Sequence, residues 1–399
     1  MKYGKTPREL ESAVNTARAK LQLATLDPLG LTSSEFVRNC RDLSISDTVS
    51  LDAYRRTLRG GKPVPPSSLA LAPMSATLSE DSPEGEVIKF LQRVPAAAGD
   101  SKTAPGIQGK ELEIESVLIP MIGSSGASTY TLCVSSQVGC AMGCTFCETA
   151  QMGLIRSLTP SEIVGQWYAA KHIVGIAPKN IVFMGMGEPM DNYDNVVQAV
   201  AVLKDHNGAG VPISNITIST VGRVDGIRRL AEQIKNDGWH RLNLALSLNA
   251  PNDEVRSEIM PINRKWRLAE LQEALLAWPK FAGNKLCIEY VLIPGVNDRP
   301  DHVRQIAEFM EPFRVTDAQG RPTRKPRALI NLIPYNPRRN SPWPAPREEE
   351  VDTFLNALIA AGVFAKRRRT KGRTMMGACG QLGAAHIRQR RLVEPTVSA

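Results

Sequence analysis

Three cysteines in the middle of the chain have a spacing that suits a metal site. They form the run Cys140-Ala-Met-Gly-Cys144-Thr-Phe-Cys147. Three thiolates on one short loop can bind three irons of a [4Fe–4S] cubane and leave the fourth iron open for another ligand. A structural zinc site needs four nitrogen or sulfur ligands, and the nearest later histidine is His172, inside an expected helix. The pattern therefore favours an iron–sulfur cluster over zinc.

Composition bounds the class of protein. The 399 residues are 42% apolar, enough for one large α/β domain with additions or for two to three smaller domains. The seven cysteines are odd in number and four of them lie within residues 133–147, which indicates metal binding or catalysis in a reducing compartment. We find no run of 18 apolar residues and no apolar secretory segment. We therefore expect a cytoplasmic protein without a membrane span.

Positive charge is concentrated near the carboxyl-terminal end. The formal net charge is +9, and residues 361–399 carry nine basic side chains against the single acid Glu394. These are Lys366, Arg367, Arg368, Arg369, Lys371, Arg373, Arg388, Arg390 and Arg391. Such a cluster either binds a polyanion such as nucleic acid or forms a solvated tail, and charge alone does not separate the two.

Strand and helix patterns alternate from residue 128 onward. Apolar, β-branched runs predict strands at 129–135, 180–184, 215–219, 241–248, 285–293, 328–333 and 363–367. Helices are expected at 193–205, 223–236, 266–277, 300–311 and 346–361, and Thr159, Pro160 and Glu162 predict a capped helix start. This order predicts an α/β fold with a parallel sheet, as an open or partial (β/α)6 barrel. Active sites of such folds lie at the carboxyl ends of the strands.

Polar residues follow several of these predicted strands. Gly185-Met-Gly187-Glu188-Pro189 combines glycines, which admit a ligand close to the backbone, with a carboxylate that can pair with an ammonium. Later strands end at Ser219-Thr220, Ser247-Leu-Asn249 and Pro334-Tyr-Asn336. Any one of these is more often a strand-end cap than a ligand. Their shared position nevertheless predicts a common binding site.

The cysteine spacing resembles that of the radical S-adenosylmethionine (SAM) superfamily, and longer motifs narrow the resemblance. Thr131–Cys140, Met184–Pro189, Ala250–Asp253 and Ala378–Leu382 are similar to motifs of the RlmN/Cfr family, over about residues 111–385. The resemblance implies a [4Fe–4S] cluster on Cys140, Cys144 and Cys147 and two SAM per turnover. It also implies methylation of an RNA adenine, namely adenine 2503 of 23S ribosomal RNA, with adenine 37 of transfer RNA as a second candidate.

The same resemblance implies roles for further residues. Cys379 would carry a methyl group, Cys133 would resolve an RNA–protein thioether through a transient Cys133–Cys379 disulfide, and Glu115 would accept a proton. The expected SAM site consists of Gly187, Glu188, Ser219, Ser247, Leu248, Asn249 and Asn336, although the family usually has histidine in place of Asn249. From position alone, Cys133 is equally compatible with a buried thiol, like Cys40 and Cys287. The position of Glu115 is compatible with a solvent-facing strand carboxylate.

Competing functions remain open at this point. C8 methylation of adenine, as in the Cfr branch, shares these motifs with C2 methylation. A radical SAM activase acting on a protein needs neither Cys379 nor the basic run, and a non-enzymatic metal-containing RNA-binding protein does not need the polar strand ends. We therefore favour an RNA adenine-C2 methyltransferase, supplied with electrons by a donor such as flavodoxin and acting as a monomer.

The chain divides into four expected segments. Residues 1–80 form a mostly helical accessory region and a candidate RNA-docking element, and residues 81–125 form a linker and a β extension. Residues 126–375 form the core barrel, and residues 376–399 a loop with Cys379 and a basic tail. Glycine, proline, serine and alanine predict linker and irregular structure over 61–110, with strands at 87–94 and 115–120.

Overall fold

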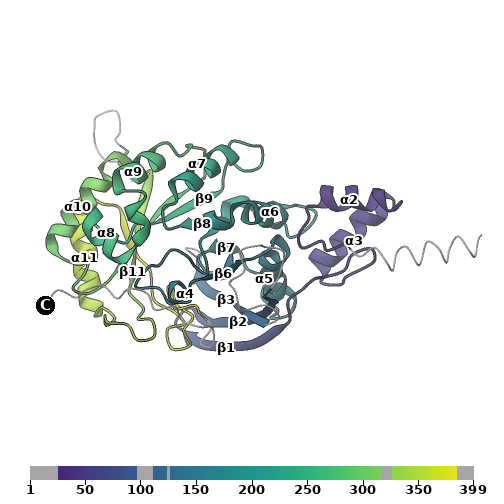
Figure 1. Ribbon diagram of the computed structural model, residues 1–399, viewed down its shortest axis with the longest axis horizontal. Helices are drawn as coiled ribbons and strands as arrows, with labels where there is room; N and C mark the ends of the chain where they lie inside the picture. Colours follow the sequence, from purple (N-terminus) through teal and green to yellow (C-terminus); the bar gives the residue numbers. More distant parts are fainter. Residues whose placement is uncertain (1–25, 97–110, 124–125, 316–325, 384–399) are drawn as a thin grey trace, which may run out of the picture. The chain divides into compact units, whose positions relative to one another are not determined.

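The computed structural model describes residues 26–96, 111–123, 126–315 and 326–383 (Figure 1). The chain falls into two compact units. Unit 1 comprises Met1–Ala72, Thr159–Ile176 and Val197–Val211, and unit 2 comprises the remainder. Within the described ranges, no helix has the length and apolar character required to cross a membrane.

Unit 2 is built on one ten-stranded sheet in the order β1-β2-β3-β4-β7-β8-β9-β10-β11-β12. Its strands are β1 Met74–Ser82, β2 Gly85–Pro95, β3 Glu111–Ile122, β4 Ser128–Cys133, β7 Asn180–Phe183, β8 Ile216–Thr220, β9 Asn243–Ser247, β10 Leu286–Leu292, β11 Ala328–Pro334 and β12 Ala365–Arg367. In this sheet order, the neighbours from β4 to β12 pair in parallel, whereas the neighbours from β1 to β4 pair antiparallel. A separate antiparallel pair joins β5 (Gln137–Gly139) to β6 (Leu154–Ser157).

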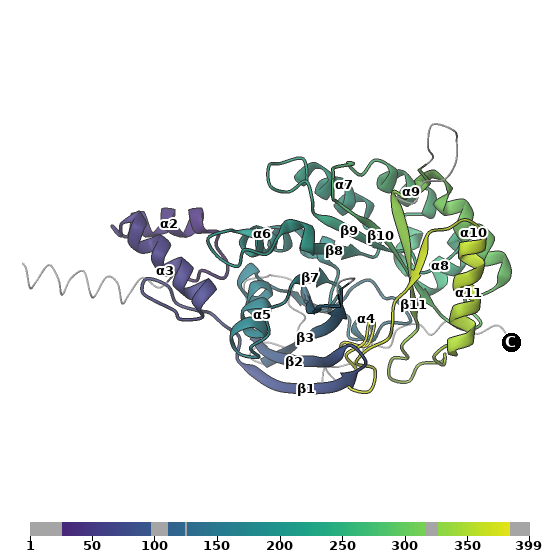
Figure 2. The same ribbon diagram turned by 180° about the vertical axis from the view of Figure 1, so that it is seen from behind.

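Helices connect the parallel strands. The longer ones in unit 2 are α7 Val224–Gln233, α8 Asp253–Ile259, α9 Leu268–Leu276, α10 Pro300–Met310 and α11 Glu348–Ala360. They lie outside the curved run of strands, and Figure 2 shows α11 beside β11. Shorter elements are α4 Glu148–Gln151 and the 3-10 turns η1 Pro189–Asn192, η2 Ile213–Asn215, η3 Pro261–Arg264 and η4 Glu311–Phe313. Parallel strands covered in this way are apolar on both faces. The predicted α/β class with a partial barrel is confirmed.

The prediction of linker and irregular structure over 61–110 is wrong in part. Residues 74–82 form β1, and β2 is longer than the expected strand 87–94. The sequence of β1, MSATLSEDS, is largely polar and exposed. It becomes a strand because its backbone pairs with β2, a contact that no local pattern encodes.

Helix α8 was also not expected. It starts at Asn252, whose side-chain oxygen accepts a hydrogen bond from Val255 N at 2.9 Å. At seven residues it is too short to show a clear helical period in the sequence.

Unit 1 is helical. It contains α2 (Ser33–Asp42), α3 (Asp47–Gly60), α5 (Pro160–His172) and the carboxyl-terminal part of α6 (Tyr193–Lys204). The Arg55 guanidinium donates to the Asn207 side-chain oxygen at 2.6 Å, and the rings of Phe36 and Tyr54 pack 5.5 Å apart. Helices are therefore present in the expected accessory region, of which residues 1–25 lie outside the described part of the chain.

The predicted start of α5 provides a stability test. The Thr159 hydroxyl accepts from Glu162 N at 3.3 Å, and the Glu162 carboxylate accepts from Thr159 N at 2.9 Å. We expect Thr159→Ala to lower the free energy of unfolding by about 1 kcal/mol, measured by denaturant titration. Ser46, the N-cap of α3, makes no side-chain capping bond, so Ser46→Ala is the matched control with a smaller effect. Equal losses in the two variants would contradict the capping argument.

Candidate active site

A cavity opens within unit 2 at the carboxyl ends of the parallel strands. Residues from β8, from the segments that follow β7, β9 and β11, and from the cysteine loop contribute to its wall. Of the residues to which the sequence analysis assigned a role in binding the cluster, binding SAM or catalysis, eight line this cavity: Cys144, Cys147, Gly187, Glu188, Ser219, Ser247, Asn249 and Cys379. The structure thus brings together segments more than 200 residues apart in the chain.

Cys144 and Cys147 of the cysteine loop line this cavity, whereas Cys140 is buried beside them and is not among the lining residues. Burial raises the pKa of each thiol, and Cys144 and Cys147 further raise the pKa of Cys140. The donors that the loop offers are three cysteine sulfurs. Three thiolates can bind three irons of a [4Fe–4S] cluster, so this donor set fits such a cluster.

Glu188 is fixed in the wall by backbone amides. Its two carboxylate oxygens accept hydrogen bonds from Met190 N at 3.1 Å and Val221 N at 2.9 Å. Burial raises the pKa of this carboxyl group, while the bonds from Val221 and Met190 oppose the rise. A buried carboxylate at a cavity wall is a suitable partner for an ammonium group.

Gly187 allows the close approach that places Glu188. Its φ is +102°, in a region that favours glycine, and an added Cβ would lie 2.6 Å from the Cβ of Gln137. The Gln137 side-chain oxygen accepts from Glu188 N at 2.9 Å. The glycine is therefore required by the packing of the loop against β5.

The expected polar residues of the later strands have different surroundings. Ser219 and Ser247 line the cavity. Asn249 also lines it, in a left-handed conformation with φ of 55°, and its side-chain oxygen accepts from Val291 N at 3.0 Å. Leu248 is buried and is not among the lining residues, and its amide donates to Glu289 O at 3.0 Å.

Arg256 holds the strand ends beneath these residues, and the sequence did not indicate it. The side chain is fully buried. It donates to Leu248 O at 3.1 Å, Val221 O at 2.6 Å and the Asn263 side-chain oxygen at 3.0 Å. Burial lowers the pKa of Arg256 to about 10. A motif search could not find this residue, because most of its partners are backbone carbonyls, which carry no sequence signature.

Cys379 lies close enough to Cys133 to raise the pKa of the Cys133 thiol. Burial raises the pKa of Cys133 to about 12, and Cys379 raises it further, whereas Arg368 lowers it. Burial likewise raises the pKa of Cys379, and Arg368 opposes that rise. All seven cysteines are free thiols in this structure. Glu289, which lines the cavity and which the sequence did not indicate, also interacts with Arg368.

Glu115 and Asn336 contact the segment that carries Cys379, residues 375–383, here called the Cys379 loop. The Glu115 carboxylate pairs with Lys89 at 2.9 Å and accepts from Gly383 N at 3.1 Å. It is nearly fully buried, so the solvent-facing interpretation is wrong. The Asn336 amide nitrogen donates to Cys379 O at 3.3 Å, and Asn336 is not among the residues that line the main cavity.

Three arginines of the basic run interact with side chains of other segments. Arg367 pairs with Glu348 and Asp352, and Arg369 pairs with Glu84 at 3.2 Å. Arg368 interacts with Cys379, Glu289 and Cys133. Arg388, Arg390 and Arg391 lie outside the described residues.

The metal site has a direct chemical test. We expect anaerobically reconstituted protein to bind about four irons, and Cys140→Ala, Cys144→Ala or Cys147→Ala to lose them. Cys287→Ala removes a thiol on β10 and is the matched control that should keep its iron. Measurement is by metal analysis, and stoichiometric zinc without iron in the reconstituted protein would contradict the cluster.

Comparison with known proteins supports the interpretation of this cavity as the site of a cluster and SAM. Residues 134–310 match the model of the Radical SAM superfamily. The chain is 43% identical over 281 residues to "Probable dual-specificity RNA methyltransferase RlmN 1" of Protochlamydia amoebophila, covering 70% of this chain and 72% of that protein. It is 41% identical over 282 residues to "Dual-specificity RNA methyltransferase RlmN" of Lawsonia intracellularis, covering 69% and 74% of the two chains.

A solved structure gives the same result for the fold. A radical SAM methyltransferase from Sphaerobacter thermophilus superimposes with a TM-score of 0.73 at 30% identity, over 89% of this chain and 98% of that one. The cavity with its cysteine loop, the extent of the matches and the level of identity lead to one conclusion. The chain belongs to the RlmN family of radical SAM enzymes and is an RNA methyltransferase that uses a [4Fe–4S] cluster and SAM.

Proposed function

We propose that this enzyme methylates carbon C2 of an adenine in RNA through a methyl group carried on Cys379. The observation that carries the proposal is the location of Cys379, which lines the same cavity as Cys144, Cys147 and Glu188 and lies near Cys133. A thiol at that position can meet both a ligand of the cluster and a substrate base. C8 methylation of adenine is the alternative that the same residues allow.

The electron-poor character of the C2 carbon explains why a radical is needed. The C2 carbon of adenine is electron-poor, so the electrophilic methyl group of SAM does not react with it directly. When bound, the reduced cluster supplies a carbon radical by cleaving a second SAM, which removes this mismatch. In the proposal, Cys140, Cys144 and Cys147 hold three irons, and Glu188 pairs with the SAM ammonium. Gly187, Ser219, Ser247, Leu248, Asn249 and Asn336 complete the proposed SAM site.

The two thiols then make and break defined bonds. The Cys379 thiolate takes the methyl group from the first SAM, forming a carbon–sulfur bond as the sulfonium bond breaks. The carbon radical takes one hydrogen atom from that methyl group, and the remaining methylene carbon bonds to C2, which links RNA to Cys379. The ring then loses one electron, returned to the oxidised cluster, and one proton, which Glu115 accepts. The Cys133 thiolate attacks the Cys379 sulfur, the sulfur–carbon bond breaks, and the released carbon takes up a proton, so a methyl group stays on the base and a disulfide remains. A dithiol reductant restores both thiols.

Arg368 supports this use of the thiols. A thiolate is the reactive form of cysteine, and burial in an apolar wall disfavours it. The Arg368 guanidinium opposes that penalty at Cys133 and at Cys379. We propose that it keeps both thiols reactive within the cavity.

The proposed substrates are 23S ribosomal RNA at adenine 2503 and transfer RNA at adenine 37. The relatives are named dual-specificity RNA methyltransferases, which supports two substrates. The helices of unit 1 are a candidate RNA-docking element. We further propose a monomer that acts in the cytoplasm with a one-electron donor of the flavodoxin type.

The position of methylation can be read directly. After incubation of reconstituted enzyme with SAM, reductant and unmodified 23S ribosomal RNA, we expect 2-methyladenosine in the nucleoside digest. Cys379→Ala should yield none while keeping its iron, because the methyl carrier is absent. Mass spectrometry against authentic standards separates the isomers, and 8-methyladenosine in place of 2-methyladenosine would establish the alternative.

Removal of the resolving thiol should trap an intermediate. In Cys133→Ala, Cys379 can still form its bond to RNA, but the thiol that releases the product is missing. We expect a protein–RNA adduct that migrates slowly on a denaturing gel and disappears on nuclease treatment. The double variant Cys133→Ala/Cys379→Ala is the control and should show no adduct. Normal release of methylated RNA by Cys133→Ala would instead assign Cys133 a packing role only.

A further inference from the structure

The first end of the Cys379 loop is held by a buried ion pair on the antiparallel strands. The Lys89 ammonium donates to Met376 O at 3.0 Å and to Met375 O at 3.4 Å. It also pairs with the Glu115 carboxylate at 2.9 Å, and the two side chains are only 5% and 3% exposed. The loop backbone is therefore fixed just before Cys379.

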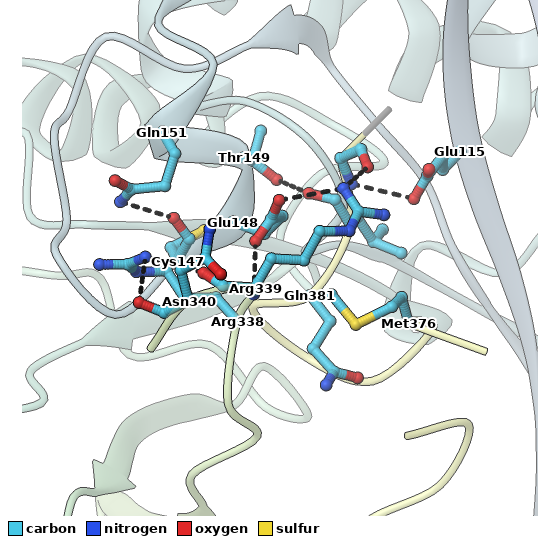
Figure 3. A network of polar contacts seen from close by, with 12 residues as sticks. Glu115, Cys147, Glu148, Thr149, Gln151, Arg338, Arg339, Asn340, Met376 and Gln381 are labelled. Atoms are coloured by element: carbon cyan, nitrogen blue, oxygen red, sulfur yellow. Dashed lines mark hydrogen bonds and ion pairs between the residues drawn. The ribbon is translucent and has the colours of Figure 1, made fainter. Parts of the chain in front are cut away.

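The other end of the loop is held at Gly383 by two charged groups. Gly383 N donates to the Glu115 carboxylate at 3.1 Å, and Gly383 O accepts from the Arg339 guanidinium at 3.3 Å. Figure 3 shows Glu115 and Arg339 converging on this end of the loop. Gly383 thus joins the Lys89–Glu115 pair to a second charged pair.

The second charged pair belongs to the metal-binding loop. Arg339 donates through its side chain to one Glu148 oxygen at 3.1 Å and through its backbone amide to the other at 2.9 Å (Figure 3). Glu148 directly follows Cys147, and its own amide donates to Gly380 O at 2.8 Å. The Glu148 side chain is 4% exposed and that of Arg339 is 35% exposed.

The end of the Cys379 loop packs tightly against Glu148 and Thr149. A Cβ added at Gly383 would lie 2.9 Å from the Glu148 Cγ. The Thr149 hydroxyl donates to Leu382 O at 2.5 Å, next to the same glycine. The end of the Cys379 loop is therefore registered against the residues that follow Cys147.

We propose that Arg339 is a positioning residue for Cys379, acting through Glu148 and the Gly383 carbonyl. The inference rests on the proposed function, in which Cys379 carries the methyl group. A misplacement of about 1 Å between reacting groups costs on the order of 100-fold in rate. Arg339 joins the loop that holds the cluster to the loop that holds the methyl carrier. It thereby keeps SAM cleavage coupled to methyl transfer.

The test measures coupling in the full-length reconstituted enzyme. We expect Arg339→Ala to keep its iron and to form 5′-deoxyadenosine, while the ratio of 5′-deoxyadenosine to methyl groups in RNA rises on the order of tenfold. Arg339→Lys should restore part of the coupling, because an ammonium can still pair with Glu148. Gly383→Ala, which displaces Glu148 from the opposite side, should uncouple in the same direction.

A second measurement does not depend on turnover. Amide hydrogen exchange of the peptide covering residues 378–383 should become severalfold faster in Arg339→Ala. Arg304→Ala removes an arginine from an exposed ion pair with Glu308 on α10 and is the matched control. It should change neither the coupling ratio nor the exchange.

The outcomes separate the two proposals. Wild-type enzyme that leaves no methyl group on any RNA would overturn the proposed function. Active wild-type enzyme together with an unchanged ratio in Arg339→Ala would overturn only the positioning role. Unchanged exchange of residues 378–383 in that variant would overturn it as well.

Discussion

The candidate site depends on the parallel pairing of the strands from β4 to β11, because parallel strands all end at one edge of the sheet. That constraint brings Glu188, Ser219 and Ser247 to a single cavity with the cysteine loop. Hydrogen bonds from a buried arginine also stabilise this edge of the sheet. Arg256 bonds to backbone carbonyls after β8 and β9, so one buried guanidinium keeps neighbouring strand ends in register with the site.

The antiparallel strands β1 to β3 have a different task. These strands and the turn between β1 and β2 present charged side chains to the segment that follows β12. Glu80 accepts from Thr374 N at 3.0 Å, and Glu84 pairs with Lys371 at 2.5 Å. With Lys89 and Glu115 they hold the chain up to Cys379. A segment that would otherwise be a long exposed loop is thus attached to the sheet, and breaking one partner of a buried pair is costly.

Arg368 also contributes to the electrostatics of the cavity. Arg368 stands in a run of basic residues whose sequence resembles a nucleic-acid contact, yet it interacts with Cys379, Glu289 and Cys133. Its neighbours Arg367 and Arg369 are occupied by acids of other segments. Three adjacent residues of one type therefore have different surroundings, because side chains along an extended chain point in alternating directions.

The sequence by itself determined the features that are local. The spacing of Cys140, Cys144 and Cys147, the capped start of α5 and the alternation of strands and helices all follow from neighbours within a few residues. The parallel order in turn predicted that Glu188, Ser219 and Ser247 would share one edge. Only the tertiary structure decided the pairing of the polar strand β1 with β2, the Arg256 bonds, the interaction of Arg368 with the thiols and the Glu148–Arg339–Gly383 contact. These interactions depend on packing that no local pattern records, and several of them join segments tens to hundreds of residues apart.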